Sequence, residues 1–104
     1  FVEFDTLYGH KRDVSGYAKA LEDFDKKLPK LFSTLDEEDL LIITADHGND
    51  PTFHGSDHTR EQVPVLIRNK NFSNKNYGLV KFADIGATMS NFLGVEPING
   101  TAIR

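Results

Sequence analysis

The segment that decides the fold is Leu40-Leu41-Ile42-Ile43-Thr44-Ala45, which leads directly into Asp46-His47-Gly48. Its first four residues are apolar, as in a strand of a parallel sheet that is covered on both faces. The sequence therefore predicts a central strand over residues 40–45. Ligands of open α/β sheets bind beyond the carboxyl ends of the strands, so the end of this strand is the expected place for a site.

The loop that follows the central strand is rich in side chains that can bind a metal ion. Residues 44–60 hold three of the four histidines and three aspartates, interrupted by two glycines and a proline. Asp46 and His47 can both turn toward an ion, because Gly48 relaxes the backbone just after them. Imidazole and carboxylate groups without thiolates favour Zn²⁺ or Mn²⁺ over Ca²⁺, which prefers shells made of oxygen alone.

Further candidate ligands lie near the start of the chain. Residues 1–4 alternate in a way that suits a strand, which ends at Asp5 and precedes a loop containing His10. A right-handed crossover from this strand to the central one would place Asp5 and Asp46 at the same edge of the sheet. The expected metal ligands are Asp5, His10, Asp46, His47 and His58. Five ligands suit two ions roughly 3.5–4 Å apart, an arrangement that holds a transferring phosphoryl group.

Two amphipathic helices are expected. Asp13 is a suitable N-cap, and apolar residues then recur at spacings of three and four as far as Leu35. Pro29 lies inside this pattern and should kink the helix or divide it in two. A second helix is expected to begin at residues 82–84 and to stop at Gly94.

The remaining strand is expected over residues 62–68, where Pro64 argues for an edge position or for the start of the strand. Strands and helices thus alternate, which predicts an α/β fold with a mostly parallel sheet and flanking helices. A chain of 104 residues has room for a single domain with a modest core.

Composition narrows the class of protein. Hydrophobic residues make up 38% and charged residues 27%, with a formal net charge of −4, so nucleic-acid binding is not expected. No apolar run approaches the roughly 18 residues that a membrane span needs. The absence of cysteine fits a reducing compartment. We therefore expect a soluble, cytoplasmic protein that does not bind membranes.

Several polar residues could have either a functional or a purely structural role. Asp50 and Asp57 could hydrogen-bond to metal-binding histidines or simply cap turns. Thr59 and Arg60 could contact a phosphate, although Arg60 could equally be an ordinary surface cation. His54 is expected to lie at an exposed loop tip rather than in the metal site. The expected ligands have a structural alternative as well, since aspartate, histidine and glycine are ordinary turn residues.

Four stretches of the chain resemble the C-terminal part of the bacterial phosphopentomutases, a family within the alkaline phosphatase superfamily. They are Phe4–Asp13, Thr44–Thr52, Gly55–Glu61 and Phe82–Thr88, and they follow one another in the order of the family. The resemblance implies an isomerase that interconverts ribose 1-phosphate and ribose 5-phosphate, and their deoxyribose counterparts, at a centre of two Mn²⁺ ions. Zn²⁺ and Mg²⁺ are the alternative metals. It also implies a phosphorylated threonine as phosphoryl donor and glucose 1,6-bisphosphate as activator.

Carried over to this chain, the resemblance implies that Asp5, His10 and His58 hold one metal and that Asp46 and His47 hold the other. The nucleophilic threonine, one further metal-binding aspartate and the cap domain of the family have no counterpart here. We therefore interpret residues 1–104 as one C-terminal fragment of the core domain, without a catalytic nucleophile. Alone, it should be inactive and should self-associate through exposed strand edges.

Two other interpretations compete with this one. Cofactor-independent phosphoglycerate mutase is similar in its Ala-Asp-His-Gly-Asn motif, but its first aspartate and histidine are four residues apart, whereas Asp5 and His10 are five apart. The other alternative is a metal-binding module that catalyses no reaction.

Overall fold

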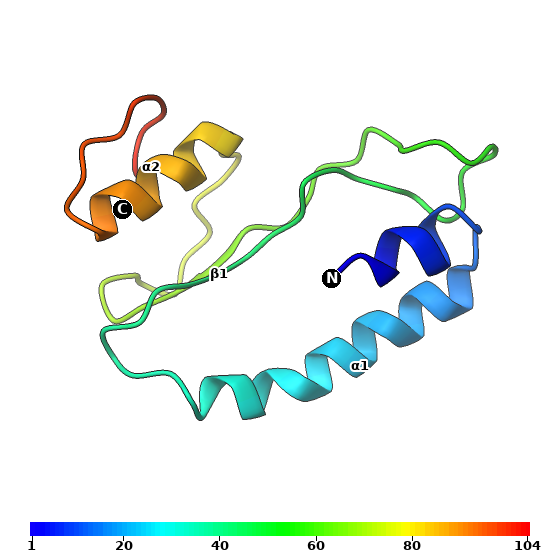
Figure 1. The fold of residues 1–104 in the computed structure, drawn as a ribbon, viewed down its shortest axis with the longest axis horizontal. Helices are drawn as coiled ribbons and strands as arrows, with labels where there is room; N and C mark the ends of the chain where they lie inside the picture. Colours follow the sequence, from blue (N-terminus) through cyan, green and yellow to red (C-terminus); the bar gives the residue numbers. More distant parts are fainter. The chain divides into compact units, whose positions relative to one another are not determined.

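The computed structural model in Figure 1 describes all residues from 1 to 104. In chain order the elements are η1 (Phe4–Gly9), α1 (Val14–Phe32), β1 (Leu41–Ile43), β2 (Leu66–Arg68) and α2 (Phe82–Phe92). Two compact units are formed, one by residues 1–36 and 42–66 and the other by residues 37–41 and 67–104. The chain is an α/β protein with helices and a small sheet, and none of its helices could span a membrane.

The sheet consists of β1 and β2, which pair in an antiparallel arrangement. Both strands are shorter than predicted, because residues 40–45 yield a strand only over Leu41–Ile43 and residues 62–68 only over Leu66–Arg68. Farther along, an isolated antiparallel bridge joins Gly48 to Thr59. The two strands are connected by a loop without a helix, so the chain simply turns back on itself (Figure 1).

The predicted strand over residues 1–4 is wrong, and with it the crossover that was to join it to the central strand. The chain forms the short π-helix η1 from Phe4 to Gly9 instead. Phe1 and Phe4 are three residues apart and therefore fit one side of a helical turn as well as they fit the strand pattern. Both rings pack against Phe24 of α1, with centroids 5.4 and 6.1 Å away, and this contact decides between the two patterns.

The first amphipathic helix is confirmed as α1. Its N-cap is Asp13, whose carboxylate accepts a hydrogen bond of 2.9 Å from the backbone N–H of Gly16. The helix continues through Pro29 undivided and ends at Phe32, three residues before the predicted Leu35. Pro29 lies near the C-terminal end of the helix, so the backbone N–H group that it lacks interrupts the helical hydrogen bonds only there. No residue of α1 is buried.

The second helix is confirmed as α2, which belongs to the other unit. It runs from Phe82 to Phe92, and the residues that it buries are Ile85, Ala87 and Thr88. Gly94 follows with a φ of 70°, the left-handed conformation that commonly ends a helix. The stop predicted at Gly94 is therefore correct.

The C-terminal segment is held against α2 by hydrogen bonds from its backbone N–H groups to side chains of the helix. The carboxylate of Asp84 accepts hydrogen bonds from the backbone N–H groups of Lys81 and Thr101, each 2.9 Å long, and these two bonds lower the pKa of Asp84. The hydroxyl of Thr88 accepts a third, also 2.9 Å long, from the N–H of Ile103. The tail thus has defined partners although its own backbone forms no helix or strand.

We expect Gly100→Ala to destabilise the α2 unit. Gly100 has a φ of 84°, and a Cβ atom there would collide with the backbone of Ala83 and lie 2.9 Å from the N atom of Asp84. Both effects act against the folded state, so the free energy of unfolding should fall by more than about 1 kcal/mol. Thermal unfolding of the whole protein, followed by calorimetry, measures the loss.

Gly78→Ala is the matched control for this prediction. Gly78 has a φ of 77°, but no atom lies within 4 Å of the added Cβ. It therefore carries the cost of the left-handed backbone without the collision. Equal destabilisation by the two substitutions would show that the close approach at Gly100 contributes nothing.

Candidate metal centre

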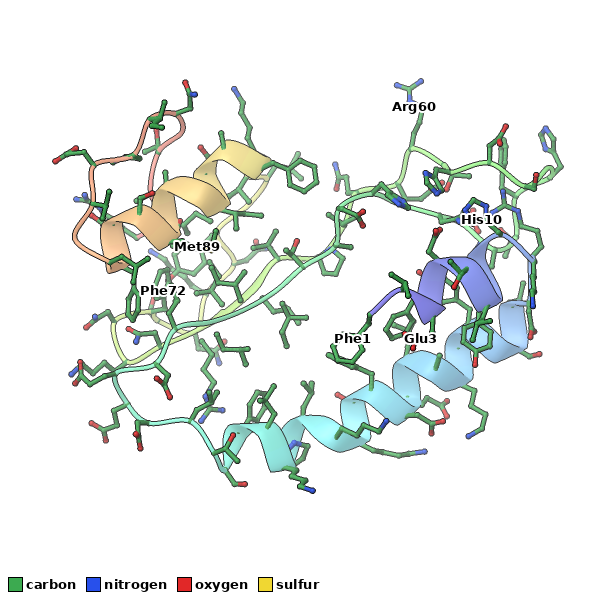
Figure 2. The ribbon with its side chains drawn as sticks, in the orientation of Figure 1. Phe1, Glu3, His10, Arg60, Phe72 and Met89 are labelled. Atoms are coloured by element: carbon green, nitrogen blue, oxygen red, sulfur yellow. The ribbon has the colours of Figure 1, made fainter.

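Three of the expected ligands come together beside η1. Asp5, His10 and His58 each present one donor atom, and these atoms all lie within 4.8 Å of one another. The Nε2 atom of His10 is 3.2 Å from Oδ2 of Asp5 and 3.1 Å from Nε2 of His58. Oδ1 of Asp5 is 3.5 Å from the same nitrogen of His58. Figure 2 shows His10 on the side of η1 that the loop after β1 approaches.

These separations fit a shared metal ion. Ligand atoms about 2.1 Å from one ion lie roughly 3.0–3.4 Å apart in an octahedral or tetrahedral shell. One carboxylate and two imidazoles form a mixed oxygen and nitrogen set, which suits Mn²⁺ and Zn²⁺. Asp5, His10 and His58 are also only partly shielded from solvent, so an ion can reach them.

The other two expected ligands lie beside this triad. The ring of His47 stacks on that of His58, with centroids 3.6 Å apart and planes inclined by 21°. Oδ2 of Asp46 lies 3.6 Å from Nε2 of His47, and the Asp46 side chain is 89% exposed. All five residues therefore belong to the first unit, and each lies close to at least one of the others. Asp46 is the most exposed side chain of the group.

Backbone carbonyls determine which nitrogen of two histidines is free. Nδ1 of His10 lies within hydrogen-bond distance of the Ser56 carbonyl, and Nδ1 of His47 lies 3.2 Å from the Gly48 carbonyl. Because a carbonyl can only accept, both Nδ1 atoms must carry the proton. Both Nε2 atoms then keep their lone pairs for a metal, which is the usual arrangement of metal-binding histidines.

The carboxylate of Asp5 is kept ionised by its neighbours. Nδ2 of Asn49 donates a hydrogen bond of 2.7 Å to its Oδ1 atom. This bond lowers the pKa of Asp5, partial burial acts in the opposite direction, and the imidazoles of His10, His58 and His47 lower it further whenever they are protonated. Asp5 is therefore a negatively charged acceptor across the neutral pH range.

The family model described as the metalloenzyme superfamily matches residues 1–97. The chain belongs to the metalloenzyme superfamily. Members of such a family depend on a metal, and Asp5, His10 and His58 are a group that could hold one.

Curated relatives of this superfamily member are named phosphopentomutase. The protein of that name from Buchnera aphidicola is 55% identical over 105 residues, which cover 99% of this chain and 26% of the relative. Those from Chromohalobacter salexigens and Actinobacillus succinogenes are 54% and 55% identical, over 94% and 99% of this chain and 25% and 27% of their own lengths. The chain therefore spans about a quarter of the length of these relatives.

Two residues of this metalloenzyme site were missed by the sequence analysis, Arg12 and Asn49. The guanidinium of Arg12 donates hydrogen bonds into the loop after β1, and the Asn49 side chain joins it to Asp5. Spacing and composition give no sign of either role. Their only signal is position, since Arg12 follows His10 by two residues and Asn49 follows His47 by two.

Asp50 and Thr59 make local hydrogen bonds within the loop. The Asp50 carboxylate accepts from the N–H of Thr52, 2.8 Å away, and from its hydroxyl, 2.7 Å away. The hydroxyl of Thr59 accepts a bond of 2.6 Å from the N–H of Asp50 and donates to the Glu61 carboxylate. These contacts shape the loop, and they match the turn-capping interpretation of Asp50.

The other polar residues of the loop lie on its outside. Asp57 contributes its backbone carbonyl to Arg12, while the residue itself is exposed. Arg60 is exposed, and Figure 2 shows its side chain extending away from the ribbon and from His10. His54 is exposed and stacks on Phe53, with ring centroids 4.2 Å apart. His54 thus lies in an exposed loop segment, as expected.

Proposed function

We propose that the whole protein containing these residues is a phosphopentomutase, which interconverts ribose 1-phosphate and ribose 5-phosphate and their deoxyribose counterparts. The observation that carries the proposal is 52–55% identity to proteins of that name over 94–99% of the chain. The cluster around Asp5 supports it, because carboxylates and imidazoles at one edge of a fold suit metal-assisted phosphoryl transfer. The activity is proposed for the whole protein and not for residues 1–104 alone.

The proposed metal sites use the five residues described above. Asp5, His10 and His58 would hold one ion, and Asp46 and His47 the other, with Mn²⁺ as the proposed metal and Zn²⁺ or Mg²⁺ as alternatives. When bound, such ions neutralise charge on a transferring phosphoryl group and orient its oxygens. The protein contributes orientation, because carbonyl groups hold His10 and His47 with Nε2 free, and Asn49 holds Asp5.

The same proposal covers partners and location. Sugar phosphates would be the substrates, glucose 1,6-bisphosphate the activator, and nucleoside catabolism in the cytoplasm the setting. Asp57, Thr59 and Arg60 are proposed to support the metal site or to contact a phosphate, and the backbone carbonyl of Asp57 accepts a hydrogen bond from Arg12.

For the architecture, we propose that residues 1–104 are one C-terminal part of an alkaline phosphatase-like core domain with a mostly parallel sheet. Each strand of the β1–β2 pair has one edge without a partner strand, and α1 buries none of its residues. Further strands of the whole protein would pair at those edges. Residues 1–104 in isolation should instead self-associate there.

A substrate comparison tests the proposed function. The whole protein, supplied with Mn²⁺, should convert ribose 1-phosphate in a coupled assay and leave 3-phosphoglycerate unchanged. Conversion of 3-phosphoglycerate alone would replace the proposal with a phosphoglycerate mutase. Metal binding without conversion of either compound would favour a module that catalyses no reaction. Residues 1–104 alone should bind metal without turnover.

A further inference from the structure

We propose that Arg12, acting through Asn49, is a positioning residue for the metal centre, a role that rests on the proposed metal sites. It would hold the loop after β1 against the end of η1 and orient the carboxylate of Asp5. Arg12 itself contributes no metal ligand, because a guanidinium carries donors only.

The contacts of Arg12 reach four places in the loop. Its guanidinium donates hydrogen bonds of 2.5–2.8 Å to three backbone carbonyls and one side-chain oxygen, those of Gly55, Asp50, Asp57 and Asn49. A bond of 3.2 Å to the Gly9 carbonyl joins the same group to η1. The segment from Asn49 to Asp57 is therefore bound to the side chain of a single residue, Arg12, which follows His10 by two positions.

The side chain of Asn49 connects Arg12 to Asp5 through two hydrogen bonds. Its Oδ1 atom accepts from Arg12 at 2.5 Å, and its Nδ2 atom donates to Asp5 at 2.7 Å. Arginine can only donate and an ionised aspartate can only accept, so the two partners determine which way the amide points. Asn49 is only 9% exposed, and this residue has little room for another orientation.

Two backbone features fit this arrangement. Arg12 is the one residue other than glycine with a positive φ, 54°, a conformation that persists where surrounding contacts enforce it. A Cβ atom on Gly9 would lie 2.7 Å from Nδ2 of Asn49, so the amide packs directly on the Gly9 backbone. The left-handed backbone of Arg12 and the absence of a side chain at Gly9 thus allow Asn49 to pack against η1.

Two possible roles of Arg12, as a nearby positive charge or as a positioning residue, predict opposite effects of its removal on metal affinity. If Arg12 acted only as a nearby positive charge, Arg12→Ala would strengthen the binding of a divalent cation. If Arg12 positions the ligands, the same substitution should weaken binding, by about 10–100-fold, as is typical when a partner of a metal ligand is lost. The sign of the change therefore separates the two roles.

The experiment measures Mn²⁺ affinity of the whole protein by isothermal titration calorimetry, with the electron paramagnetic resonance spectrum of bound Mn²⁺ as a second readout. Arg12→Ala should weaken binding about 10–100-fold and change the spectrum. Lys11→Ala is the matched control, because it removes the same charge from the adjacent, exposed position, where the side chain forms no hydrogen bond or ion pair. Lys11→Ala should leave both readouts close to those of the unmodified protein.

Asn49→Asp provides a second test that keeps the size of the side chain. The new carboxylate adds a negative charge, which by charge alone would strengthen Mn²⁺ binding, but it cannot donate to Asp5 and would repel it. We expect weaker binding, again by about 10–100-fold. This variant decides the matter if Arg12→Ala does not fold.

The outcomes separate this inference from the proposed function. Equal or tighter Mn²⁺ binding by Arg12→Ala, or by Asn49→Asp if Arg12→Ala does not fold, would overturn the positioning role while leaving the metal centre in place. Failure of the unmodified protein to bind Mn²⁺ would overturn the metal centre and the positioning role together. Loss of ribose 1-phosphate conversion with unchanged metal binding in Arg12→Ala would also contradict the inference.

Discussion

Asp5→Ala is expected to weaken Mn²⁺ binding by at least about 100-fold, because removal of a ligand should exceed the 10–100-fold cost of losing a supporting partner. Asp5 supplies the only carboxylate of the triad with His10 and His58. Its removal leaves two imidazoles without a negatively charged ligand and leaves the Nδ2 donor of Asn49 without its acceptor. Titration calorimetry on the whole protein measures the affinity, and turnover of ribose 1-phosphate should fall with it.

Asp25→Ala is the matched control for this substitution. Asp25 is an exposed residue of α1 whose side chain forms no hydrogen bond or ion pair, so its substitution removes the same charge without removing a contact of the metal site. Its Mn²⁺ affinity should equal that of the unmodified protein. The ligand role of Asp5 would be refuted if Asp5→Ala bound Mn²⁺ as tightly as Asp25→Ala does.

Lowering the pH from 8 to 5.5 is expected to weaken Mn²⁺ binding. An imidazole nitrogen binds a metal only when it carries no proton, so protons compete with the ion for each histidine ligand. His10 and His58 are both expected on one ion, so both must present an unprotonated nitrogen before it can bind. Competition with a chelator of known pH behaviour measures the affinity at each pH.

Asp5 adds nothing to the pH dependence in this range. The hydrogen bond from Asn49 and the nearby histidines hold the pKa of Asp5 below its ordinary 3.8, so it is ionised at pH 5.5 and at pH 8. A carboxylate with a lowered pKa loses its contribution only at more acidic pH. Equal Mn²⁺ affinity at pH 5.5 and pH 8 would contradict the assignment of histidine ligands.

The helices could be predicted closely because their signals are local. The spacing of apolar residues after Asp13 and the stop at Gly94 depend on neighbours within a few positions, and both are seen in the structure. The segment 1–4 was mispredicted because Phe1 and Phe4 satisfy a strand pattern and a helical turn equally well. Only their packing against Phe24, a partner distant in sequence, distinguishes the two.

The chemistry of the site is evident from residue types, since carboxylates and imidazoles without thiolates are available for a metal. Which of these side chains lie close together depends on the fold, because the separations between Asp5, His10 and His58 depend on how the loop after β1 returns to η1. The roles inferred for Arg12 and Asn49 also came from the structure alone. A hydrogen bond between residues 37 positions apart leaves no periodic mark in a sequence, because it requires the folded backbone to bring its two partners within about 3 Å.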